Sequence, residues 1–220
     1  MPAAGKGGRY HHGDLRAALI DTAIELIAER GVRGFSLTEA SRRLGVAGSA
    51  PYAHFADRDE LLAAVAVRAY QQLREQLLPA IRQSPEPAGQ LAAMASAYVR
   101  FAAGSRPLFE VMYGAGLDKA RHPGIEAAER PLTDAFLDCV SALVGDDEPA
   151  QAEDLAIAVE ATAHGHAALL LDGDFGTDGD AVAQAADRAG RATLALVASR
   201  QLLHQPAEEA KTAAGQSAPI

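Results

Sequence analysis

The sequence predicts an all-α protein of about nine helices, on three observations. Apolar residues make up 49% of the 220 residues, and alanine, the strongest helix former, dominates them. Aromatic residues, which favour strands, make up only 5%. Apolar positions recur with a helical period, and no segment alternates between polar and apolar residues for long enough to form a strand.

The first predicted helix follows a short basic arm. Residues 1–12 are rich in glycine and carry basic side chains, so we expect a flexible arm there. A helical face then runs to Gly31, where the pattern stops. The apolar residues of that face are Leu15, Leu19, Ala23, Leu26 and Ile27.

A capping box begins the second predicted helix, at residues 37–44. Ser36 and Glu39 have the spacing at which the hydroxyl accepts a backbone N–H bond and the carboxylate reaches back to the cap. Leu37, Ala40 and Leu44 should face inward. Gly45 is predicted to end the helix in the left-handed conformation.

The third predicted helix is short and contains Pro51, in "GVAGSAPYAHF" (45–55). It must end near His54, because Asp57 and Glu60 form a second capping box for the next helix. Proline is tolerated in a first helical turn, whose N–H groups have no partner within the helix. We therefore predict Ser49 as the cap and Ala50 as the first helical residue.

Clear breaks separate the remaining helical patterns. "SPEP", "GSRP", "RHPG", "GDDEP" and "DGDFGTDGD" interrupt the chain with proline and glycine. The polar tail 204–220 is expected to be disordered. The predicted helices are 57–82, 88–103, 107–114, 124–144, 150–171 and 180–203, with Leu62, Val65, Ala69, Leu73 and Leu77 inward in the first of them.

Charge is distributed unevenly along the chain. Residues 1–60 hold eight Lys and Arg and eight Asp and Glu, whereas residues 61–220 hold 12 and 21. Only the N-terminal part could therefore lie against a polyanion without a large repulsive field.

The two short helices at 37–44 and 50–54 have the spacing of a helix-turn-helix, whose second helix enters the DNA major groove. Ser36 and Thr38 lie at a helix N-terminus and can donate to a phosphate, while Arg42 and Arg43 add positive charge.

The second helix and the residue after it add further candidate contacts. Tyr52 can place its ring on the core or offer its hydroxyl to a phosphate. Arg58 begins the next helix, where its charge opposes the helix dipole, a placement that a nearby phosphate would favour. The predicted base-facing residues offer few hydrogen-bonding groups, so thymine methyl contacts should contribute to readout. The predicted base-facing residues are Gly48, Ser49, Ala50, Ala53 and His54.

The segment "GFSLTEASRRLGVAGSAPYAHFADRDELLAAV" resembles the DNA-binding domain of TetR family transcriptional regulators, over about residues 10–66. The remainder resembles the TetR subgroup with a Trp-His-Gly C-terminal signature, through "SRPLFEVMYG", "RHP" and "AHGHAALLLDG". The chain has no tryptophan, and Ala161 or a neighbour stands in its place. The family more often has a capping residue at 47 and leucine at 51. Here Ala47 and Pro51 are expected to shift or rigidify the start of the recognition helix.

The resemblance implies a ligand-responsive repressor that binds a palindromic DNA operator. We expect a cytoplasmic homodimer without enzymatic activity or a cofactor. The domains would be the arm (1–12), the helix-turn-helix domain (13–60), a C-terminal ligand-binding and dimerisation domain (61–203) and the tail (204–220). No secretory signal or membrane-spanning helix is evident in the sequence.

The last two predicted long helices are apolar on more than one face, so each needs several partners. We expect two helices from each subunit to form a four-helix dimer interface. The predicted interface residues are Leu155, Val159, Thr162, His166, Leu169, Val182, Ala186, Ala189, Thr193, Leu196 and Val197, and a second stripe holds Ile157, Ala161, Ala168 and Leu171.

An apolar effector is expected to bind among the helices at 88–103, 107–114, 124–144 and 150–171. The large flexible and aromatic side chains concentrate there, and a ligand pocket combines apolar walls with a few polar groups. A packed core without a cavity is the alternative. The predicted pocket residues are Tyr98, Phe101, Phe109, Met112, Tyr113, Phe136 and His164.

Several alternatives remain open from the sequence alone. "HGH" (164–166) and "YHHG" (10–13) could bind metal, although packed histidines and a DNA-contacting or disordered arm are simpler, so we predict no metal site. The single cysteine, Cys139, is expected in the core and excludes an intrachain disulfide. The competing classes are an enzyme or small-molecule-binding bundle without a DNA role, and a protein-binding adaptor. No nucleophile–base or acid–base pair favours catalysis.

Overall fold

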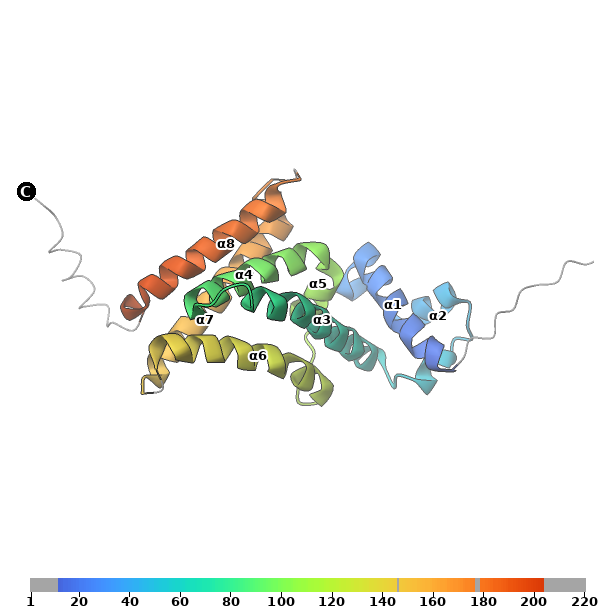
Figure 1. Cartoon of the computed structure of the whole chain (residues 1–220). Helices are drawn as coiled ribbons and strands as arrows, with labels where there is room; N and C mark the ends of the chain where they lie inside the picture. The colour runs from blue at the N-terminus through green and yellow to red at the C-terminus, as the bar shows by residue number, and fades with distance from the viewer. Residues whose placement is uncertain (1–11, 146, 177–178, 204–220) are drawn as a thin grey trace, which may run out of the picture. The chain divides into compact units, whose positions relative to one another are not determined.

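The computed structural model describes residues 12–145, 147–176 and 179–203 (Figure 1). This part of the chain holds eight α-helices, three short 3-10 helices and no strand, which confirms the all-α class. The expected flexible arm and disordered tail fall almost entirely outside the described residues. The elements are α1 (His12–Arg30), η1 (Val32–Gly34), α2 (Leu37–Leu44), η2 (Ala50–Ala53), α3 (Arg58–Ile81), α4 (Pro87–Gly104), α5 (Arg106–Gly114), α6 (Pro123–Val144), α7 (Pro149–Asp172), α8 (Ala181–Ala198) and η3 (Arg200–Leu202).

The chain divides into two compact units. Unit 1 consists of Met1–Tyr70 and Pro107–Ala128, and unit 2 of Gln71–Arg106 and Glu129–Ile220. The boundary proposed from the sequence, after residue 60, cuts the chain near the start of α3. Unit 1 includes α3 as far as Tyr70, and Leu61 and Val65 in this half of the helix are fully buried.

The core of unit 1 includes the predicted inward face of α1. Leu19, Ala23 and Leu26 are fully buried, and α1 packs against α2. Leu37 and Ala40 of α2 are also buried, as the pattern predicted. The apolar period of α1 and α2 therefore determines how the first two helices pack.

Small residues bring the helices of unit 2 close together. Helix α4 packs against both α7 and α8, which also pack against each other. The Ser96 hydroxyl of α4 donates a 2.8 Å hydrogen bond to the Ala186 carbonyl of α8. Gly190 of α8 lies opposite: a Cβ there would be 2.6 Å from Ser96 Oγ and 3.3 Å from the Ala92 carbonyl oxygen. This close approach explains why glycine occupies a helix interior.

Gly190→Val is expected to destabilise the protein by about 1–3 kcal/mol, because the side chain overpacks the α4–α8 contact and displaces the Ser96 hydroxyl. Denaturant unfolding of the variant would measure this loss. Ala183→Val provides the matched control, since Ala183 is an exposed position of the same helix. A Gly190→Val protein as stable as the control would contradict the close approach.

Candidate nucleic-acid interface

The sequence predicted both ends of α2. The Ser36 hydroxyl accepts a 3.2 Å bond from the Glu39 backbone N–H, and Gly45 ends the helix in the left-handed conformation at φ 66°. The second half of the expected capping box is absent among the described contacts. The Glu39 carboxylate binds arginine side chains instead, as described below, so the capping-box prediction is half correct.

The next element, η2, is a 3-10 helix that holds Pro51 in its first turn, where the missing N–H of a proline is tolerated. The Ala47 carbonyl accepts a 2.9 Å bond from Ala50 N–H, three residues on. A further three-residue bond joins Tyr52 N–H to the Ser49 carbonyl at 3.2 Å. The predicted start at Ala50 is confirmed, but Ser49 makes no side-chain cap bond, and η2 replaces the ninth α-helix.

The predicted base-facing residues differ in exposure. Gly48, Ser49 and Ala53 are exposed, whereas Ala50 and His54 are half-buried. Within the described part of the chain, His54 Nε2 is buried and has no hydrogen-bond partner. This edge of the imidazole cannot reach a base unless the side chain rotates.

Tyr52 faces solvent. Its exposed fraction is 56%, while the adjacent Pro51 is buried. Of the two roles left open by the sequence, the structure favours an outward-facing phenol over a ring packed on the core. Thr38 is exposed as well, one residue inside the α2 N-terminus.

Carboxylates within unit 1 pair with the predicted DNA-contacting arginines. Arg42 donates two bonds to Glu39, at 3.0 Å from Nε and 2.7 Å from Nη2, and Arg30 Nη2 lies 3.2 Å from the same carboxylate. Arg43 donates two bonds to Glu29, at 2.7 and 2.6 Å. The bond from Arg42 lowers the pKa of Glu39 from 4.5 to about 2, and the bond from Arg43 lowers the pKa of Glu29. Both acids therefore stay ionised at neutral pH and offset the arginine charge.

Arg58 has a structural role that the sequence did not reveal. Its Nη2 donates to the Val32 carbonyl at 2.6 Å and its Nε to the Phe35 carbonyl at 3.2 Å. The guanidinium also lies 5.9 Å from the centroid of the Phe35 ring. These contacts explain a cation at the start of α3 without a phosphate, so the dipole argument for a phosphate contact at Arg58 no longer holds.

Sequence reasoning missed one candidate contact, Arg33 in η1. It is exposed and makes no ion pair within the described residues, unlike Arg42 and Arg43. Arg33 lies in the turn that leads into α2, shortly before the cap at Ser36. This position in the sequence was the feature from which a DNA contact could have been predicted.

The predicted pocket residues divide between the two units. In unit 1, Phe109 is buried, Met112 is half-buried and Tyr113 is exposed. In unit 2, Phe101 is fully buried and Phe136 is half-buried. Also in unit 2, the Tyr98 hydroxyl lies 3.0 Å from His164 Nδ1 and joins α4 to α7.

Part of the predicted dimer interface proves to be the subunit's own core. Helix α4 occupies one apolar face of α7 and of α8, and the sequence could not tell that face from one turned toward a partner subunit. Six predicted interface residues are therefore corrected to core positions: Leu155, Val159, Ala186, Ala189, Thr193 and Val197. The other five are accessible: Thr162, His166, Val182 and Leu196 are half-buried, and Leu169 is exposed.

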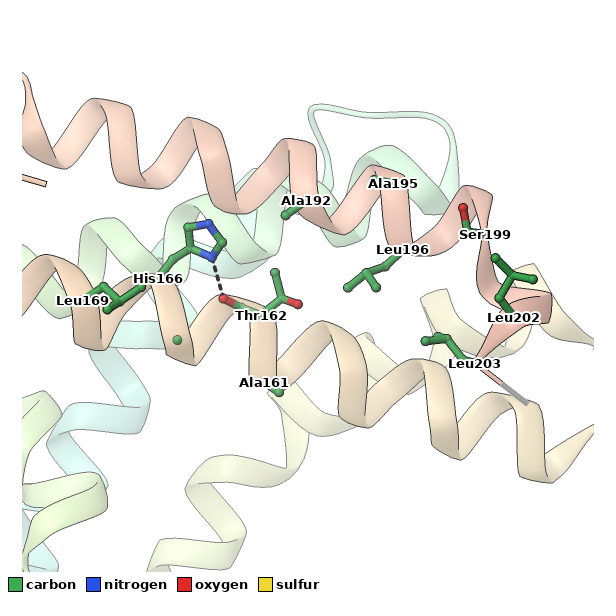
Figure 2. Close-up of a pocket in the computed structure, with 11 residues that line it drawn as sticks. Ala161, Thr162, His166, Leu169, Ala192, Ala195, Leu196, Ser199, Leu202 and Leu203 are labelled. Carbon is green, nitrogen blue, oxygen red and sulfur yellow. Dashed lines mark hydrogen bonds between the residues drawn. The ribbon is translucent and has the colours of Figure 1, made fainter. Parts of the chain in front are cut away.

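An apolar groove runs between α7 and α8 on the surface of unit 2. Figure 2 shows Thr162 and His166 from α7 and Leu196 from α8 along it. The His166 ring donates from Nδ1 to the Thr162 carbonyl, 2.8 Å away, because a carbonyl oxygen can only accept. The remaining lining residues are Ala161, Gly165, Leu169, Ala192, Ala195, Ser199, Leu202 and Leu203.

The described residues contain no group of three or more metal-ligating side chains. The "HGH" histidines bond to Tyr98 and to the Thr162 carbonyl, while Tyr10 and His11 of "YHHG" lie outside the described part. Cys139 is buried as predicted, its thiol donates to Gln90, and burial raises its pKa. No helix in the described ranges is long and apolar enough to cross a bilayer.

Comparisons with known proteins match both parts of the chain. Residues 19–65 match the family model of bacterial regulatory proteins of the tetR family, and residues 91–193 match the tetracyclin repressor-like C-terminal domain. A search of curated proteins gave no match.

Solved structures resemble the chain over most of its length. A protein of unknown function from Rhodococcus sp. RHA1 is 31% identical, with a TM-score of 0.65 over 84% of this chain and 97% of that one. A tetR family regulatory protein from Rhodococcus RHA1 is 21% identical, with a TM-score of 0.65 over 83% and 96%. The regulator PfmR from Thermus thermophilus is 19% identical, with a TM-score of 0.59 over 81% and 96%. The last two show a shared fold.

The capped α2, the glycine turn and η2 place this chain among the helix-turn-helix DNA-binding regulators. The chain belongs to the TetR family of transcriptional regulators.

Proposed function

We propose that the protein is a cytoplasmic repressor that binds a palindromic operator as a homodimer and responds to an apolar small molecule. The observation that carries this proposal is the exposed surface formed by α2, η2 and Tyr52, in a chain whose two matched regions are the two parts of a TetR family regulator. The proposed DNA contacts are the exposed residues of this surface, with Arg33 added. "SRPLFEVMYG" and "AHGHAALLLDG" support the Trp-His-Gly subgroup.

DNA binding can be tested with the DNA upstream of the protein's own gene. We expect retention on heparin at low salt and a discrete gel shift with this DNA that competitor DNA of unrelated sequence does not remove. An enzyme or a small-molecule-binding bundle without a DNA role would give no sequence-dependent shift.

The exposed groove between α7 and α8 supports a homodimer. A contiguous apolar surface rimmed by polar residues marks an interaction site. Its small residues, including Ala161, Gly165 and Ala195, allow helices of a second copy to approach closely. A second copy seated in this groove would complete a four-helix interface, and the twofold symmetry would place two recognition elements on a palindrome.

Unit 2 also supports an effector site. The Tyr98–His164 pair places two polar groups beside the apolar side chains of α4 and α7, a combination typical of ligand sites. An effector shifts operator affinity only if it binds the two conformations of the dimer with different affinity.

We expect at least one compound from a thermal-shift screen of apolar and amphipathic molecules to change operator affinity by about 5–150-fold, the usual range of allosteric coupling. Operator titration with and without each stabilising compound measures the change. Tyr98→Phe removes the hydroxyl and should weaken the effect of a compound that uses it. If every stabilising compound leaves operator affinity unchanged, the effector proposal fails, while the DNA-binding proposal stands.

A further inference from the structure

The Glu39 carboxylate lies between two guanidinium groups on the α2 surface. It accepts two bonds from Arg42, and Arg30 Nη2 lies 3.2 Å away. The Glu39 side chain is only 17% exposed, whereas that of Arg42 is 71% exposed. The two arginines therefore enclose the carboxylate, and much of the Arg42 side chain remains open to solvent.

This arrangement matches the way in which arginine binds phosphate. The planar guanidinium fork recognises carboxylate and phosphate oxygens with the same paired N–H bonds. The Glu39 carboxylate thus occupies donors that a DNA phosphate would use. Its charge also reduces the combined charge of Arg30, Arg42 and Glu39 to a single positive charge.

The carboxylate is not required to cap α2. The Ser36 hydroxyl accepts from the backbone N–H of residue 39, and the reciprocal bond from the Glu39 carboxylate is absent among the described contacts. A glutamine at this position would keep the cap and remove only the charge.

We propose that Glu39 competes with DNA phosphate for Arg42 and Arg30, and so holds down the affinity of the protein for DNA of any sequence. This inference rests on the DNA-binding function proposed above and adds a determinant of specificity to it. Phosphate contacts supply most non-specific affinity, so weakening them raises the ratio of operator binding to non-specific binding.

The test compares the full-length parent with Glu39→Gln on a duplex of unrelated sequence, by fluorescence anisotropy over a range of salt concentrations. We expect the variant to bind roughly three- to tenfold more tightly at low salt, and the plot of log affinity against log salt to steepen by about one unit per subunit. Glu153→Gln makes the same charge change at an exposed position of α7 and should stay near the parent. Glu39→Asp keeps the charge on a shorter side chain and should fall between the parent and Glu39→Gln.

A double variant separates competition from a structural role. In an Arg42→Gln background, the gain from Glu39→Gln should shrink, because one of the released arginines is missing. Circular dichroism and thermal unfolding check that the variants keep the helical content and the stability of the parent. Unchanged DNA binding by Glu39→Gln overturns the inference. Weaker binding overturns it as well and would indicate that the carboxylate positions Arg42 for DNA. If the parent binds no DNA at any salt concentration, the DNA-binding function fails along with the inference.

Discussion

Leu169→Glu is expected to convert the protein into a monomer and to reduce operator affinity by roughly 100-fold or more, because the two recognition elements then bind independently. Leu169 lies in the apolar groove between α7 and α8 and is 46% exposed in the single chain. A charge there stays hydrated in the monomer but loses its water in a dimer that covers the groove. Sedimentation gives the oligomeric state, and operator titration gives the affinity.

Leu137→Glu supplies a closely matched control. Leu137 lies on α6, outside the groove, and its exposed fraction of 45% is nearly the same. We expect this variant to remain a dimer and to bind the operator like the parent. If both variants dissociate the dimer, or neither does, the groove is not the dimer interface.

Tyr52→Ala is expected to weaken binding to every DNA sequence by about tenfold or more, because a hydroxyl bond to a charged phosphate is lost in each subunit. The phenol is exposed beside a buried Pro51, so its removal should leave the fold intact. Titration of operator and unrelated duplexes measures both affinities. Tyr52→Phe keeps the ring and should lose nearly as much if the hydroxyl makes the contact. A Tyr52→Ala protein that binds all DNA as tightly as the parent would contradict the assigned role.

Base-facing residues should behave differently from Tyr52. Ser49→Ala is expected to change the preferred sequence while keeping most of the non-specific affinity, since base contacts specify and phosphate contacts position. His54→Ala should have a smaller effect than the sequence alone suggested, because part of its ring is buried. Binding to a panel of operator variants distinguishes the two outcomes.

Local patterns predicted the elements whose structure depends on local bonds. The bounds of α2 follow from the cap at Ser36 and from Gly45, so the sequence predicts both ends. The start of η2 was predicted as well. Its 3-10 form was not, because a proline in the first turn is compatible with an α-helix as well.

Contacts between helices determined the features that the sequence alone did not predict. The Glu39 carboxylate binds Arg30 from α1 in place of the backbone of its own helix, and no pattern within α2 indicates this. An apolar stripe on a helix also does not show whether it packs within its own subunit or against a partner subunit. Val159 and Leu169 both fitted a dimer interface, but α7 buries the first in its own subunit and exposes the second.

We propose that two copies of this chain read one symmetric DNA site. The most direct test is to select fragments from random DNA with the purified full-length protein and to sequence them. We predict a palindrome whose half-sites lie about 34–36 Å apart, one turn of DNA, or a multiple of that spacing. Enrichment of no sequence, or of a single half-site without symmetry, would contradict the claim.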